Sequence, residues 1–519
     1  MITEILYVLI IFAAAIYLGV TPTYNYWKKK GVKYVKPVPF FGNAWEFFRM
    51  KKTTGEIFKE FYFREEFRDE KFFGIFLGRR PCLLVKDLDL IKKILIKHFE
   101  HFADRAISSN SKIPLNDHLF NLTGWRWRTL RRKLTPAFTS GKIKTMLNII
   151  SECALQLDNY LEESARKEDV VEMKKVMSEY TIDIIGTCAF GLQLNTMANP
   201  DCEFKQMATQ LLQRSFRNGL KRAILVTMPA VANYLGFSFV NRNVNDYFLK
   251  IFVETMKDRV EHETSRNDFL QLLIKLKNEG TVGDAEETVK VVGEIAEDGK
   301  CVYEWTDEIL AAQALVFLLA GYNTSASVMS FALYELARNP DIQERLAKEI
   351  RTALEGGGGV MSYEILLGMK YLDMVISETM RLYPPMDNLI RKVAKPYQVE
   401  GTDVTLDENT RIFIPLAAIH RDPEYYPDPD RFDPERFTPV EKEKRHPMTF
   451  LPFGDGPRSC IGNRFGLVIV KAGLSAILNK YAFEVIGETK TAPEFNAKGF
   501  NAELKGGVRL RIKKRPPLK

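Results

Sequence analysis

The chain has 519 residues, of which 46% are hydrophobic and 27% charged, a composition typical of globular proteins with ample material for a core. Its 74 Lys and Arg residues exceed its 66 Asp and Glu residues and give a formal charge of +8. Neither a zinc-finger spacing nor a basic groove-reading helix accompanies this charge, so nucleic-acid binding is not expected. The six cysteines contain no Cys-x-x-Cys pair, which argues against a disulfide framework and suits a reducing compartment.

A run without charged side chains occupies residues 5–20 near the N-terminus. With its flanks, this run approaches the roughly 20 apolar residues that span a bilayer. Three lysines follow at positions 28 to 30, so we predict an uncleaved membrane anchor over residues 1–24, with the body of the protein in the cytosol. A cleaved signal peptide is the alternative, but its positive charge would precede the apolar run.

A basic, Pro-rich linker is expected over residues 25–45, since Pro37 and Pro39 prevent a continuous helix there. Residues 46–519 are predicted to form a single domain, mainly α with small β-sheets. Short β-like runs occur near residues 72–104 and again after 390, whereas residues from about 125 to 350 show helical spacing of apolar side chains. One segment, residues 308–339, is apolar almost all round in its middle, which predicts a helix buried through the core.

The segment Phe-Gly-Asp-Gly-Pro-Arg-Ser-Cys-Ile-Gly, residues 453–462, differs from an ordinary core sequence. Its glycines allow a tight loop, and backbone N–H groups together with a following helix N-terminus would stabilise a thiolate at Cys460. Taken alone, the pattern also fits a redox-sensing cysteine or a phosphate-binding loop. No Gly-Lys-Ser/Thr follows, which weakens the phosphate interpretation.

At every fixed position this segment resembles the haem-thiolate signature of the cytochromes P450, Phe-x-x-Gly-x-Arg-x-Cys-x-Gly. Three shorter motifs of that family follow the expected order: Trp127 with Arg131, Glu378 with Arg381, and the Pro-Glu-Arg-Phe of residues 434–437. Stretches such as KLTPAFTSGK and HRDPEYYPDPDRFDPERF are most similar to the insect microsomal family-6 branch. The resemblance covers essentially the whole chain.

The resemblance implies a fold of about a dozen helices around haem b, with Cys460 as the ligand of the iron. It assigns the remaining cofactor-binding positions to Trp127, Arg131, Ala320, Gly321, Arg391, Phe453 and Arg458. Guanidinium groups suit the bidentate binding of the haem carboxylates. By spacing alone, Arg131 could equally be a solvated basic residue.

The resemblance also implies two roles near bound dioxygen. Thr324 would offer a hydroxyl, although a lone Thr in a helix usually bonds its own backbone carbonyl. Asn323 stands where the family commonly has Asp or Glu, so we expect it to orient water for proton delivery. The alternative is that Asn323 only packs against a neighbouring helix.

The substrate pocket is expected to include residues one and two turns before Thr324 on the same helix face, namely Ala320 and Val316, with Leu319 beside them. The resemblance adds Phe120, Met386, Leu389 and Phe500, and for each of these core packing remains an alternative. A buried structural triad is implied for Glu378, Arg381 and Arg436, although i,i+3 spacing alone would also fit a surface ion pair.

The implied activity is that of a haem-thiolate monooxygenase, which inserts one atom of dioxygen into small lipophilic substrates such as plant toxins, insecticides or endogenous lipophiles. Electrons would come from NADPH through NADPH–cytochrome P450 reductase, with cytochrome b5 as a further candidate partner, at the endoplasmic reticulum membrane. A dioxygen-independent isomerase or lyase and a non-catalytic haem-binding sensor are the alternatives. The basic residues Lys92, Lys93, Lys97, Arg128, Arg132 and Lys133 are predicted to form either a reductase-docking face or an ordinary solvated surface.

Overall fold

The computed structural model describes residues 21–106, 114–199, 201–211, 216–237, 240–264, 266, 268–279, 305–487, 489, 493–497 and 503–516. Most of the predicted anchor and the predicted substrate residue Phe500 lie outside these ranges, so the two predictions remain untested.

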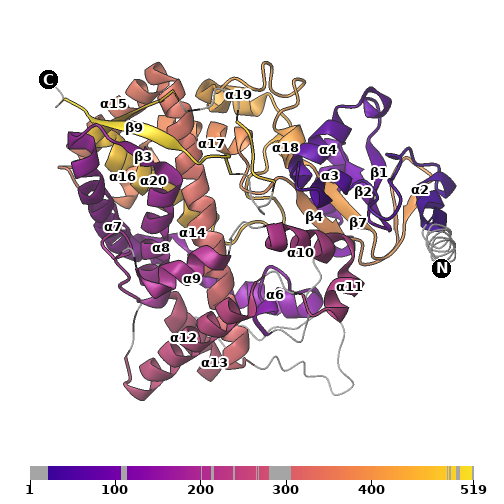
Figure 1. The fold of residues 1–519 in the computed structure, drawn as a ribbon, viewed down its shortest axis with the longest axis horizontal. Helices are drawn as coiled ribbons and strands as arrows, with labels where there is room; N and C mark the ends of the chain where they lie inside the picture. The colour runs from indigo at the N-terminus through magenta and orange to yellow at the C-terminus, as the bar shows by residue number, and fades with distance from the viewer. Residues whose placement is uncertain are drawn as a thin grey trace, which may run out of the picture.

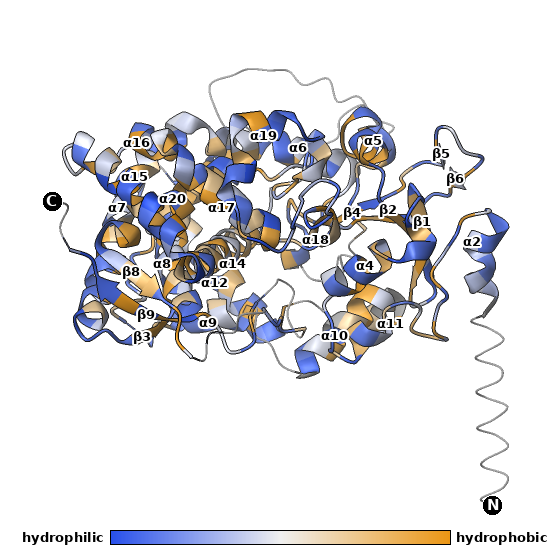
Figure 2. Ribbon diagram, turned by 90° about the horizontal axis from the view of Figure 1, so that it is seen from above, coloured by the Kyte–Doolittle hydropathy of each residue, from blue (hydrophilic) through white to orange (hydrophobic). Residues whose placement is uncertain are grey.

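Helix α14 (Asp307–Arg338) runs through the middle of the molecule, as Figure 1 shows. It begins at Thr306, whose side chain accepts a hydrogen bond from the backbone N–H of Ile309, and acidic residues occupy its first turn. Its composition would also allow it to cross a membrane, but most of its side chains are buried inside the protein. Figure 2 shows this largely apolar helix surrounded by other helices. The prediction of a core helix in this part of the chain is therefore confirmed.

Many of the helices around α14 contribute to the larger of two hydrophobic cores. They are α7 (Ser140–Arg166), α8 (Met173–Phe190), α9 (Glu203–Leu211), α12 (Arg242–Glu261), α13 (Phe269–Glu279), α15 (Pro340–Gly356), α16 (Tyr363–Gly368), α17 (Lys370–Leu382) and α20 (Asn463–Lys480). In Figure 1, α7, α8 and α20 lie to one side of α14, and α12 and α13 lie at its lower end. This arrangement leaves the opposite side of α14 facing the part of the molecule that contains the largest sheet.

The remaining helices complete the fold. They are α2 (Tyr26–Lys29), α3 (Trp45–Phe48), α4 (Thr54–Tyr62), α5 (Leu88–Lys92), α6 (Gly124–Leu134), α10 (Phe216–Thr227), α11 (Pro229–Tyr234), α18 (Leu416–Ile419) and α19 (Pro439–Glu443). The 3-10 segments are η1 (Thr21–Asn25), η2 (Glu65–Phe67), η4 (Phe99–His101), η5 (Pro114–Asn116), η6 (Thr135–Phe138), η7 (Pro434–Phe437) and η8 (Pro447–Thr449). Directly after α5, the segment η3 (Lys93–Lys97) forms a π-helical turn.

The largest sheet has the order β1 (Phe72–Leu77), β2 (Arg80–Val85), β7 (Arg411–Ile414), β4 (Leu389–Lys392). Strand β2 pairs antiparallel with β1 and parallel with β7, and β7 pairs antiparallel with β4. A three-stranded sheet has the order β3 (Val170–Glu172), β9 (Arg509–Lys514), β8 (Tyr481–Glu484), and β5 (Tyr397–Gln398) pairs with β6 (Thr405–Leu406). The fold class, mainly α with small sheets, is confirmed.

The segment expected to be a linker is part of the second hydrophobic core, which surrounds the largest sheet. Trp27 is 0% exposed, and its indole N–H donates to the backbone oxygen of Ile75 at 3.2 Å. A Cβ atom on Gly74 would lie 2.3 Å from the Trp27 ring, so only glycine leaves room for it. The folded body therefore begins before the expected boundary at residue 46, because aromatic residues near the chain start bury against β1.

A buried group formed by Glu378, Arg381 and Arg436 holds the coil that precedes the Cys460 loop; we call it the triad. Arg381 donates to both carboxylate oxygens of Glu378, at 2.6 and 2.8 Å, and both residues are 0% exposed. Arg436 lies 3.6 Å from the same carboxylate. Arg381 also donates to the backbone oxygens of three coil residues, His420, Pro429 and Arg431. These bonds fix the coil to α17.

The coil in turn holds the start of the Cys460 loop. His420 is fully buried, and its Nε2 accepts a hydrogen bond from the backbone N–H of Leu451 at 3.1 Å. Burial, together with Arg381 and Arg421 nearby, lowers the pKa of His420 to about 3, so the imidazole is neutral and able to accept. The triad thus reaches the loop through this histidine.

Candidate active site

Cys460 lies on a tight loop directly before α20. Its backbone N–H donates to the oxygen of Phe453 at 2.9 Å. Gly454 and Gly456 adopt the left-handed φ values of +67° and +69°. A Cβ atom at Gly456 would lie only 1.9 Å from the backbone oxygen of Leu95 in the π-helical turn η3. Glycine is therefore required at 456 both for the loop's conformation and for its contact with η3.

The thiol of Cys460 opens onto an internal cavity. Burial raises the pKa of this thiol, while the backbone N–H of Gly462 and the charges of Arg131 and Arg105 act to lower it. A metal ion bound to the sulfur would deprotonate it outright. Among the described residues no three His, Cys, Asp or Glu side chains gather as a metal site, so an ion held at Cys460 needs its other ligands from a cofactor.

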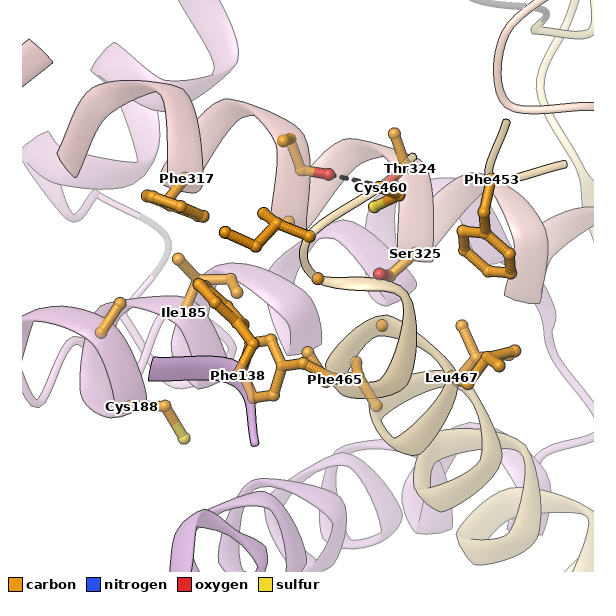
Figure 3. A pocket seen from close by; sticks show the side chains of 18 of the residues that line it. Phe138, Ile185, Cys188, Phe317, Thr324, Ser325, Phe453, Cys460, Phe465 and Leu467 are labelled. Atoms are coloured by element: carbon orange, nitrogen blue, oxygen red, sulfur yellow. Dashed lines mark hydrogen bonds between the residues drawn. The ribbon is translucent and has the colours of Figure 1, made fainter. Parts of the chain in front are cut away.

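The cavity has a volume of about 140 Å³ and lies between α14, α8, η6, α20 and the Cys460 loop. Figure 3 shows Thr324, Cys460 and Phe453 on one side of the view, with Phe138, Ile185 and Cys188 on the other. The hydroxyl of Thr324 donates to the backbone oxygen of Ala320 at 2.5 Å. The rest of the wall is mainly apolar, with aromatic rings from Phe138, Phe317 and Phe465. The site therefore combines two thiols, of Cys460 and Cys188, and two hydroxyls, of Thr324 and Ser325, with a largely aromatic and aliphatic wall.

Four arginines, Arg105, Arg131, Arg391 and Arg458, lie close enough to influence one another's charge; we call them the arginine cluster. Arg391 and Arg458 are each only 2% exposed. Within the described part of the chain, Nε of Arg391 is buried without a hydrogen-bond partner. Among the described residues, these four arginines make one ion pair, between Arg458 and Asp104 at 3.6 Å.

The cluster is electrostatically costly in the absence of an anion. Burial lowers the pKa of Arg391 to about 10 and that of Arg458 to about 9. Burial and repulsion from those two arginines hold the pKa of Arg105 well below its usual range. Trp127 supports the cluster, because the Arg458 guanidinium lies 3.9 Å over its ring. An anionic ligand would relieve the repulsion and satisfy the unpaired donor.

Comparison with known proteins decides the family. The family model described as Cytochrome P450 matches residues 32–507. The chain belongs to the cytochrome P450 family. Cytochrome P450 6k1 of Blattella germanica is 36% identical over 98% of this chain and 96% of its own length. Probable cytochrome P450 6a14 of Drosophila melanogaster is 38% identical over 95% of this chain and 96% of its own, and cytochrome P450 9e2 of Blattella germanica is 36% identical over 96% of each.

Membership in the P450 family makes this chain a haem-dependent monooxygenase, and the predicted resemblance to the insect family-6 members is confirmed. The geometry fits haem. Cys460 offers a thiol on its loop, the aromatic wall suits an apolar macrocycle, and the arginine cluster suits two carboxylates. The four arginines do not line the cavity, but the charges of Arg131 and Arg105 act on the Cys460 thiol, so the cluster lies near the loop.

The structure distributes the predicted substrate residues unevenly. Ala320 lines the cavity, but Val316, Leu319, Met386, Leu389 and Phe120, all described, are not part of its wall. Val316, Leu319, Ala320 and Thr324 do share a partly exposed face of the otherwise buried α14. The ring of Phe120 instead stacks 3.9 Å from the guanidinium of Arg105. Phe120 therefore packs beside the arginine cluster.

Gly321 and Asn323 both contact α8. A Cβ atom at Gly321 would lie 2.6 Å from Cδ1 of Ile185, so this glycine admits α8 as well as lining the cavity. Asn323 is 7% exposed and is not part of the cavity wall. Its Oδ1 accepts a hydrogen bond from Lys174 of α8 at 3.0 Å. The side chain thus faces a neighbouring helix, the alternative to the water-orienting role.

Sequence reasoning missed two residues that shape the site. Arg105 lies outside the family motifs, and no local pattern marked it as a member of the cluster. Gln313 is fully buried in α14, where its amide accepts from the N–H of Leu119 and donates to the oxygen of Asp117, at 2.8 and 2.9 Å. The same loop offers backbone oxygens to Arg105 and Arg458. A glutamine within an apolar helix was the visible signal.

Proposed function

We propose that this P450 oxidises small lipophilic substrates, xenobiotics or endogenous lipophiles, with electrons from NADPH through a flavin reductase. The observation that supports it is the aromatic cavity onto which both Cys460 and Thr324 open. Haem bound through Cys460 would supply dioxygen activation, which the thiolate favours by donating electron density. An apolar wall excludes water and selects apolar substrates.

Thr324 has a definite role in this proposal. Its proton is given to the backbone oxygen of Ala320, so the hydroxyl oxygen keeps lone pairs available to accept a hydrogen bond from water. A water held there would lie in the cavity and relay protons to the reacting oxygen. Phe453 also lines the cavity, and we expect it to shield the sulfur from solvent once haem is bound.

The reductase would dock on the basic surface formed by Lys92, Lys97, Arg128 and Arg132, with Lys133 beside it. Arg128 and Arg132 are exposed on α6, and Lys97 is exposed at the end of η3. Lys93 already pairs with Glu400 at 2.5 Å, so it contributes less free charge. The contact between η3 and Gly456 places this surface next to the Cys460 loop. Cytochrome b5 would compete for the same basic surface.

We further propose that residues 1–24 anchor the enzyme to the endoplasmic reticulum, with its catalytic domain in the cytosol. The uncharged run at 5–20 and the lysines that follow it support this orientation. Deletion of residues 1–20 should release the enzyme from membranes while leaving its haem spectrum intact. Retention in the membrane fraction after that deletion would show that another surface binds lipid.

The decisive experiment compares wild type with Cys460→His after reconstitution with reductase, NADPH and dioxygen. Wild type should form oxygenated product from lipophilic test substrates and show the thiolate-type red shift of its reduced carbon monoxide complex. Cys460→His should lose both while still binding haem. Retention of the shifted band in the variant would refute Cys460 as the ligand, and wild-type turnover without dioxygen would indicate an isomerase or lyase.

A further inference from the structure

The backbone next to Thr324 is held by side chains of α8. Lys174 donates to the backbone oxygen of Asn323 at 3.0 Å. The hydroxyl of Thr181, which shares its single proton with the oxygens of Met177 and Ser178, lies 2.9 Å from the backbone oxygen of Tyr322. Gly321, one residue before Tyr322, leaves the space that Ile185 of α8 fills. Side chains of α8 thus contact two successive carbonyls of α14, next to the residue that faces the cavity, and Lys174 makes the contact to Asn323.

The ammonium of Lys174 contacts three oxygens of α14. Besides the backbone oxygen of Asn323, it donates to the Oδ1 of that residue at 3.0 Å and to the Oγ of Ser327 at 2.9 Å. Asn323 and Ser327 are 7% and 6% exposed and lie four residues apart, on one helix face. An ammonium group has three donors and no acceptor, so position 323 must present an oxygen to it.

Lys174 is itself fixed at the start of α8. Glu172, the N-cap residue, accepts hydrogen bonds from the backbone N–H groups of Lys174 and Lys175, at 3.1 and 2.7 Å. The same carboxylate accepts from the N–H of Val508, beside β9. Glu172 therefore fixes the backbone of Lys174 both to the first turn of α8 and to the three-stranded sheet. The ammonium group reaches α14 from this fixed backbone.

We propose that Lys174 is a positioning residue for oxygen activation: it selects a hydrogen-bond acceptor at position 323, turns it away from the cavity and holds the α14 backbone at Thr324. On this view Asn323 takes no part in proton transfer. An aspartate at 323 would pair with Lys174 and stay directed at α8. The expected effect of Lys174 on catalysis rests on the proposed function. Its expected effect on protein stability does not.

The stability test compares haem-loaded wild type, Lys174→Met, Asn323→Asp and the double variant by thermal unfolding. With Lys174 present, Asn323→Asp should leave Tm unchanged or raise it, because a charge pair replaces a charge–amide bond. In the Lys174→Met background the same substitution buries an unpaired carboxylate and should lower Tm by about 2 °C or more. Equal Tm changes in the two backgrounds would overturn the proposal.

The catalytic test measures product, NADPH consumption and peroxide together. Lys174→Met should lower product formed per NADPH and raise peroxide, while the reduced carbon monoxide spectrum and substrate affinity stay unchanged. Lys174→Arg should restore the yield, and Asn323→Asp should match wild type. Lys175→Met, at an exposed neighbouring lysine, is the matched control and should have no effect. Unchanged yield in Lys174→Met would refute the positioning role. Absence of product in wild type would instead refute the proposed function, leaving the Tm comparison to decide the contact.

Discussion

The triad and the arginine cluster are both buried, and both are rich in arginine, but their partners differ. In the triad, a carboxylate, Glu378, lies between two guanidinium groups, and backbone oxygens take further donors. In the arginine cluster, the described residues provide one ion pair, between Arg458 and Asp104, for four guanidinium groups. A buried Nε without a hydrogen-bond partner occurs in both groups, at Arg391 and at Arg436, so the counter-charge is what differs. This difference indicates two roles for buried arginines. A buried arginine that is paired with a carboxylate of the same chain helps to hold the fold, whereas a buried arginine without such a carboxylate indicates a site for an anionic ligand.

The largest effect is expected where the triad loses its carboxylate. Glu378→Ala leaves two guanidinium groups in the interior without a counter-charge, which should cost about 3–5 kcal/mol of stability. We expect little folded, haem-containing protein, measured by the yield of the carbon monoxide complex and by thermal unfolding. Glu378→Gln, which keeps the shape, should be intermediate. A stable Glu378→Ala protein would break the comparison.

The arginine cluster should respond in the opposite way. Arg391→Met removes a buried, repelled charge, so the haem-free protein should be as stable as wild type or more so. Haem affinity should fall about 10- to 100-fold, because a charge-assisted bond to a carboxylate is lost. Haem titration and unfolding of the haem-free protein measure the two effects separately. If Arg391→Met lowered the stability of the haem-free protein but not its haem affinity, Arg391 would have a structural role like that of Arg381.

His420 sharpens the comparison through pH. Its folded pKa of about 3 lies below the ordinary value of 6.5, so the unfolded chain takes up a proton first as the pH falls. The contribution of neutral His420 to the free energy of unfolding is therefore fully present above about pH 6.5 and is lost as the pH falls toward 3. Between pH 7 and pH 5 this loss should be about 2 kcal/mol. Denaturant unfolding of wild type and His420→Asn at both pH values should show a smaller pH dependence in the variant.

His118 offers the matching measurement at the arginine cluster. Burial and the charge of Arg105 lower its pKa to about 4. Haem carboxylates bound nearby would offset the arginine charge, so haem binding should weaken the acid sensitivity due to His118. The contribution of His420, beside the triad, should be the same with and without haem.

The smallest effect is expected at exposed arginine and lysine side chains, where solvent already screens the charge. Charge reversal at Arg132 and Lys133 should raise the reductase concentration needed for half-maximal rate by about two- to fivefold at low salt, and less at high salt. Peroxide-supported turnover should be unchanged. If it falls equally, the two residues act on the haem site and not on docking.

Sequence alone predicted most of the chemical groups of this site. The Cys460 loop carries its own requirements, since glycines at 454 and 456 and the following helix are local features. The apolar run of α14 likewise predicted a core helix, because a helix without a polar face must be buried. Trp127, Arg131, Arg391 and Arg458 were recognised from family motifs rather than from physics.

Other features could not be predicted, because they depend on side chains distant in the sequence. Trp27 was assigned to a linker, since only the fold brings Gly74 against its ring. Arg105 has no motif, and its place in the cluster arises from the packing of its loop against Arg458.

The sequence by itself determined the cofactor class of this protein and the helix that crosses the core, and it predicted Cys460 as the ligand. Only the tertiary structure decided which buried charges neutralise one another, and which way Asn323 faces. The physical reason is range: loop conformation and helix burial follow from residues a few positions apart, whereas Lys174 and Asn323 are 149 positions apart. A pattern within one segment cannot reveal which distant side chain will satisfy a buried polar group.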